Sequence, residues 1–76
     1  MKFIEVVDSS TGRSISIGLD MIEMFYPIVK FEKGGRVVLE EVECGTEISV
    51  VGVRKVKTDM LYSEFKERLL EISRGV

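Results

Sequence analysis

The 76-residue chain contains no alanine, whereas it contains 11 valines and 7 isoleucines. Alanine is the best helix former, and β-branched side chains favour extended backbone. This composition predicts a chain dominated by β-strands. Apolar residues make up 45% of the chain, which is enough to build a core and excludes a disordered segment. A chain this short buries only ~60% of its unfolded surface, so we expect a single β-rich domain over residues 1–76.

Alternation of apolar and polar side chains predicts two strands near the N-terminus, at residues 2–8 and 13–19. Small hydroxyl residues and a glycine between them, at residues 9–12, are typical of a turn. In the second strand Ile15 and Ile17 alternate with serines and Gly18, so one face should be buried. These two strands are expected to pair as an antiparallel hairpin.

A denser apolar segment follows a short corner at Asp20 and Met21. Eight of the ten residues from 22 to 31 are apolar, and they occupy both faces of a strand. Pro27 lacks a backbone N–H, which predicts a bulge or a break at this position.

The next segments are also extended. A turn at residues 33–35 leads to a strand at 36–43, and a tight reversal is expected at Cys44-Gly45. Residues 46–57 alternate again as one long stretch. Within it, Gly52 is either a bulge in one strand or the turn of a second hairpin, and the pattern does not separate these alternatives.

The apolar period changes after Thr58. Leu61, Phe65, Leu69 and Ile72 are spaced as one stripe of a helix over residues of about 59–73. Thr58 or Ser63 is the expected N-cap, and Gly75 suits the C-terminal end. Phe65 and Leu69 should pack on the sheet with Ile15 and Ile17. The predicted fold class is therefore α+β: a twisted antiparallel sheet of about five strands with one C-terminal helix.

The order of these blocks resembles the small bacterial FlbD-like proteins. The matching residues lie in four blocks: Phe3-Ile4-Glu5-Val6; Ile15-Ser16-Ile17 followed by Ile22; Thr46-Glu47-Ile48 leading to Gly52 and Val56; and Tyr62-Ser63-Glu64-Phe65. The chain departs from this family in its longer turn at residues 9–12 and in residues 30–45, which look like an inserted hairpin. The family is named for flagellar regulation, and the resemblance implies the architecture but no catalytic residues.

Several functions are disfavoured by missing residue types. Histidine is absent, which excludes Ser-His-Asp and Cys-His catalysis within one chain. We interpret the glutamates near Cys44 as a solvated hairpin rather than a metal site, and we expect no cofactor. Cys44 is the only cysteine, so an internal disulfide is impossible, which favours the reducing cytoplasm. The N-terminus has no signal-peptide pattern, and no apolar window is long enough to cross a membrane.

Two surfaces remain as candidate sites. The first is the segment of Met24, Phe25, Tyr26 and Pro27, whose apolar side chains on both faces of a strand are either buried within the domain or form a protein interface. The second is a basic patch at residues 54–57 with a stacking ring nearby, formed by Arg54, Lys55, Lys57, Tyr62 and Lys66. The first predicts a non-enzymatic binding or self-assembly module with a homodimer or protein partner. The alternative prediction is a nucleic-acid-binding regulator, although the net charge of −2 gives no general basic footprint.

Overall fold

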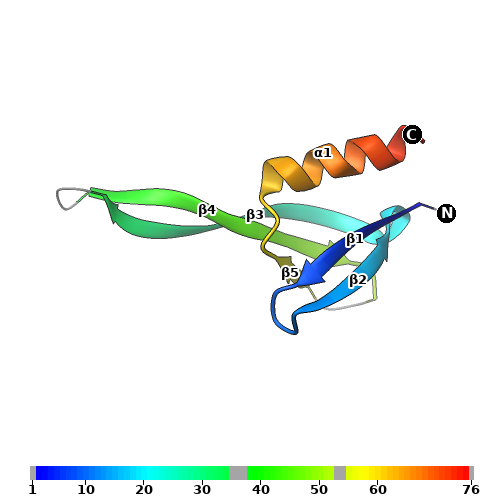
Figure 1. Ribbon diagram of the computed structural model, residues 1–76, viewed down its shortest axis with the longest axis horizontal. Helices are drawn as coiled ribbons and strands as arrows, with labels where there is room; N and C mark the ends of the chain where they lie inside the picture. Colours follow the sequence, from blue (N-terminus) through cyan, green and yellow to red (C-terminus); the bar gives the residue numbers. More distant parts are fainter. Residues whose placement is uncertain (1, 35–37, 53–54, 76) are drawn as a thin grey trace.

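The computed structural model describes residues 2–34, 38–52 and 55–75. Its elements, drawn in Figure 1, are β1 (Phe3–Asp8), β2 (Arg13–Gly18), the 3-10 turn η1 (Leu19–Met21), β3 (Ile22–Gly34), β4 (Val38–Val50), β5 (Val56–Thr58) and α1 (Tyr62–Ser73). Within these described residues, five antiparallel strands and one C-terminal helix confirm the α+β class. The strands divide between two sheets, with orders β1-β2 and β3-β4-β5.

The hairpin β1-β2 forms as the alternation predicts. Ile4 lies opposite Ile17 and Val6 opposite Ile15, so four branched side chains share the inner face. The Asp8 carboxylate closes the turn, because its Oδ1 accepts hydrogen bonds from the Ser10 backbone N–H at 2.9 Å and the Ser10 hydroxyl at 2.6 Å. Such local side-chain bonds are what make Asp and Ser turn formers.

The expected reversal at Cys44-Gly45 is wrong, because β4 runs through both residues. Gly45 is required for close approach: a Cβ at this position would lie 2.4 Å from the Thr58 carbonyl oxygen. Cys44 is the extra residue of a β-bulge, since Ile28 pairs with Gly45 and the next residue, Val29, pairs with Glu43. The glycine therefore admits a neighbouring backbone instead of turning the chain.

The expected bulge or break at Pro27 is wrong, because Pro27 pairs with Thr46 within β3. The register shifts lie between Ile22 and Met24 and between Ile28 and Val29. Among the described residues β3 has a strand neighbour on one side only, and proline is tolerated on such an edge. The stretch 46–57 is divided, with β4 ending at Val50 and β5 beginning at Val56. Gly52 lies in that connection with φ of +72°, so it belongs to a turn.

The helix begins later than its capping signals predict. Its N-cap position is Leu61, which has no capping side chain, so the expectation of Thr58 or Ser63 as the N-cap is wrong. Thr58 is instead buried in β5, where its hydroxyl accepts a hydrogen bond from the Met60 N–H. At the other end the Gly75 N–H donates to the Ile72 carbonyl, as expected for a helix terminus.

The core lies where the two sheets and α1 meet. It consists of seven buried apolar side chains: Ile4, Val6, Ile17, Ile48, Val50, Val56 and Phe65. The predicted burial of Phe65 and Ile17 is confirmed, while Ile15 and Leu69 are half-buried at the margin. The ring of Phe25 lies 5.0 Å from that of Phe65 and 5.4 Å from that of Tyr62, between centroids.

The molecule is elongated because half of the β3-β4 hairpin leaves this core. Its Cα radius of gyration is 14.2 Å and its longest extent is 50 Å. A compact chain of this length would have a radius of about 11 Å. Figure 1 shows the hairpin projecting beyond the start of α1, while both chain ends lie at the opposite end.

Candidate protein-interaction surface

We call residues 28–34 of β3 and 38–44 of β4 the arm, and the remainder of the described chain the body. No described side chain of the arm belongs to the buried core or to the apolar side chains that pack against it. Ile28, Val42 and Cys44 are half-buried, and the other arm side chains that the structure describes are exposed. The arm is thus a two-stranded ribbon held together mainly by the pairing of β3 with β4.

The face of the arm that continues the helix side of the sheet carries exposed apolar residues. Val29 is 40% exposed and Phe31 is 65% exposed. Their cross-strand partners are Glu43 and Glu41. Residues directly opposite in an antiparallel pair share a face, so this surface combines an apolar row with a row of carboxylates.

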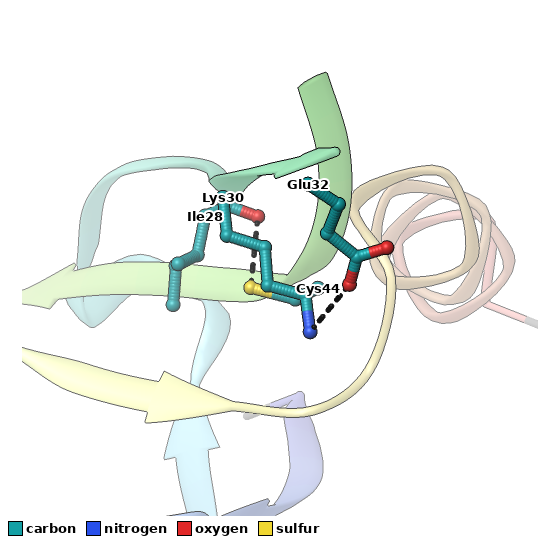
Figure 2. A network of polar contacts seen from close by, with 4 residues as sticks. All are labelled: Ile28, Lys30, Glu32 and Cys44. Carbon is teal, nitrogen blue, oxygen red and sulfur yellow. Dashed lines mark hydrogen bonds and ion pairs between the residues drawn. The ribbon is translucent and has the colours of Figure 1, made fainter. Parts of the chain in front are cut away.

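The other face of the arm is charged. Glu32 lies opposite Glu40, which is an unfavourable pairing of like charges. Lys30 on the same strand offsets the repulsion between these carboxylates, since its Nζ is 3.0 Å from Glu32 Oε1 (Figure 2). The hydrogen bond from Lys30 to Glu32, together with the attraction of that carboxylate, raises the pKa of the lysine. Lys30 therefore carries its charge at all ordinary pH values.

The bulge marks the boundary between arm and body. The Cys44 thiol is directed toward the Ile28 carbonyl oxygen at 3.4 Å, as Figure 2 shows. Figure 2 also places the Lys30–Glu32 pair beside this contact. The half-buried thiol thus has a structural contact with β3.

Glu43 joins the base of the arm to the helix. Its Oε1 accepts a hydrogen bond from the Tyr62 backbone N–H at 2.6 Å, and so satisfies one of the free donors at the start of α1. The sequence predicts a solvated Glu43 and does not predict this hydrogen bond. No local capping signal identifies the contact, because Glu43 and Tyr62 are 19 residues apart. Glu47 is also engaged, because it accepts a hydrogen bond from the Tyr26 hydroxyl. The described residues contain no group of three or more Cys, Asp or Glu side chains placed to hold a metal ion.

The four predicted interface residues are divided by the structure. Phe25 is half-buried against α1, whereas Tyr26 faces the opposite side and lies under Lys55, whose Nζ is 5.7 Å from the ring centroid. Met24 is 59% exposed and Pro27 is also exposed. Phe25 therefore belongs to the margin of the core, and the other three contribute to the surface.

The nucleic-acid candidates are likewise divided. Lys57 pairs with Glu47 and lies with Lys55 on the sheet face that turns away from α1. Tyr62 packs its ring against Phe25 on the helix side. Lys66, on the same helix, lines a groove of about 360 Å³ between α1 and the start of β3. Arg54 lies outside the described residues. The structure thus brings two lysines together but places the aromatic ring on the other face.

No family model, curated protein or solved structure matches the chain. The resemblance to FlbD-like proteins consequently stays a prediction. Within the part of the chain that the structure describes, no helix combines the length and apolar character needed to traverse a membrane.

Proposed function

We propose that the chain is a non-enzymatic protein-binding module that contacts its partner through the arm. The observation that carries the proposal is the exposure of Phe31, at 65%, beside Val29 on a ribbon that contributes nothing to the core. A two-stranded ribbon is marginally stable by itself in water. Exposed aromatic and aliphatic side chains rimmed by charges are characteristic of interaction sites. A partner would cover these side chains and support the ribbon.

Two features of the chain support a non-catalytic role in a reducing compartment. Histidine, the commonest general acid and base, is absent from the sequence. Cys44 is the only cysteine and is bonded to a backbone carbonyl, as expected of a structural thiol in the cytoplasm. We therefore favour recognition in the cytoplasm, with a second copy or another protein as the partner.

Photo-crosslinking in cells tests this proposal. The photoreactive residue p-benzoylphenylalanine replaces Phe31 in one variant and Phe3 in the matched control. Phe3 is a comparably exposed phenylalanine, at 53%, but it lies on β1 in the body. We expect covalent adducts from position 31 in clear excess over position 3. Equal yields from both positions, or none from position 31, would contradict the arm as the contact surface.

A further inference from the structure

We propose that the partner of the arm is a second copy of this chain, and this inference rests on the proposed function. The two β3 strands pair antiparallel at their open edges about a two-fold axis that passes through Phe31, perpendicular to the sheet. The product is one continuous sheet in which the arms overlap and the bodies lie at opposite ends. Both Phe31 rings then lie together on the helix side.

The open edge of β3 supplies the backbone for this pairing. Among the described residues β4 is the only strand neighbour of β3. Alternate residues of an edge strand direct unpaired N–H and C=O groups outward, where another strand can bind them. With the axis at Phe31, the paired stretch runs from residue 28 to residue 34 in each chain. Pro27, which has no N–H to donate, is the first residue outside it.

The charges along β3 match this register. Lys30 and Glu32 flank Phe31 symmetrically on one face, so the two-fold axis sets each lysine opposite the glutamate of the other copy. Within its own chain Glu32 has Glu40 opposite it on β4, and its other side is the open edge. In the dimer, the ammonium group of Lys30 from the second copy would lie next to Glu32 at this edge. The pair between Lys30 of one copy and Glu32 of the other forms twice in the dimer.

Two-fold registers that keep the axis perpendicular to the sheet but centre it on a neighbouring residue are unfavourable. A centre at Lys30, Glu32 or Lys33 sets that charged residue opposite itself, which is destabilising. A centre at Val29 brings Pro27 into the ladder, where its missing N–H removes a hydrogen bond. Among the registers centred on residues 29 to 33, only the one centred on Phe31 avoids both penalties.

Charge variants test the register by sedimentation of the purified full-length protein over a range of micromolar concentrations. In Lys30→Glu alone, and in Glu32→Lys alone, each homodimer would set like charges opposite each other twice. We expect either variant to dimerise about tenfold more weakly than the wild type. An equimolar mixture of the two variants, and the double variant K30E/E32K, should both recover the wild-type dimer, because opposite charges again face each other.

A disulfide trap checks the centre of the interface in a Cys44→Ser background. Phe31→Cys should cross-link to itself under mild oxidation, because the two Cα atoms would lie within disulfide distance. Val29→Cys is the matched control and should not cross-link, since its symmetry mate is several residues away along the strand. Cross-linking from position 29 in preference to position 31 would overturn the register.

The outcomes separate this inference from the proposed function. A wild-type mass of one chain at every concentration overturns the homodimer, and a variant mixture that stays monomeric beside a dimeric wild type overturns the register. If position 31 then still gives adducts in cells with a mass other than two chains, the arm binds a different protein and the proposed function stands. If position 31 gives no adducts either, both are wrong.

Discussion

The arm and the body share the same two long strands but differ in what covers them. Near the body β3 and β4 place Phe25 and Ile48 beneath α1, with the Phe25 ring against Phe65. Beyond the Cys44 bulge the same strand pair continues with Val29 and Phe31 in the open. The strands therefore form with or without a covering layer, whereas their side chains are buried only where α1 and the β1-β2 sheet cover them. This difference shows that β3 and β4 remain paired strands well beyond the part of the molecule in which side chains are buried.

The largest effect should come from removing the central aromatic ring of the body. Phe65 is fully buried, so Phe65→Ala should lower the free energy of unfolding by about 3–5 kcal/mol through lost burial and a cavity. A domain of this size has only roughly 4–11 kcal/mol in total, so much of the population would unfold. Urea titration followed by circular dichroism measures the change. The control is Leu70→Ala on the same helix, where 46% exposure predicts a small effect.

A smaller loss is expected from Gly45→Ala, which tests whether the junction between body and arm is closely packed. The added Cβ would lie 2.4 Å from the Thr58 carbonyl oxygen, so β5 must shift away from β4. Overpacking of this kind costs about 1–3 kcal/mol. Thermal unfolding of the variant gives the value. An unchanged melting temperature would mean that the two backbones are not held in close contact.

Glu43 links the two regions, and its removal should weaken the start of α1. Glu43→Ala leaves the Tyr62 N–H without its acceptor and should cost about 1 kcal/mol, as for the loss of a helix cap. Glu43→Gln keeps an acceptor oxygen and should recover part of that loss. The matched control is Glu41→Ala, two residues away on the same face of β4, which should change the free energy of unfolding by no more than about 0.5 kcal/mol. Urea titration compares the three variants, and equal losses from Glu43→Ala and Glu41→Ala would argue against the cap.

The arm itself should barely affect the stability of the single chain. Phe31→Ser removes a side chain that is 65% exposed, so the free energy of unfolding should change by less than about 0.5 kcal/mol. Association should nevertheless weaken in sedimentation, because the two Phe31 rings no longer pack together. If the variant unfolds as readily as Phe65→Ala does, the arm belongs to the cooperative core and the contrast between the two regions is wrong.

The smallest effect concerns the ion pair of the arm. Glu32 raises the pKa of Lys30 from 10.5, so any stabilisation by the charged lysine is fully present below pH 10.5 and is lost as the pH rises through the higher folded value. Lys30→Met should thus show the same difference in unfolding midpoint from the wild type at pH 7 and pH 9. Both side chains of the pair are more than half exposed, so the difference itself should be slight. Melting curves at dilutions where both proteins are single chains measure it, and a difference that changes between pH 7 and pH 9 would exclude Lys30 as its source.

The sequence located only the strand that carries the candidate site, because the four predicted interface residues, Met24, Phe25, Tyr26 and Pro27, all precede the arm. The apolar density of residues 22–31 predicts an interface at Met24 and Tyr26, and the same segment includes Phe31 at its far end. Alternation shows which residues share a face of a strand, yet it does not show how far a helix extends over that face. Consequently Phe25, at the margin of the core, and Phe31, in the open, looked equivalent along the chain.

The sequence by itself determined the β1-β2 hairpin and the presence of a C-terminal helix, because their signals are local. Alternation of Ile15 and Ile17, the turn at residues 9–12 and the helical stripe through Phe65 depend only on neighbouring residues. The tertiary structure decided the roles of residues whose partners lie far away in the sequence. Gly45 serves the approach of Thr58, and Glu43 caps a helix that begins 19 residues later. These roles arise from contacts between distant segments, and such contacts exist only once the chain has folded.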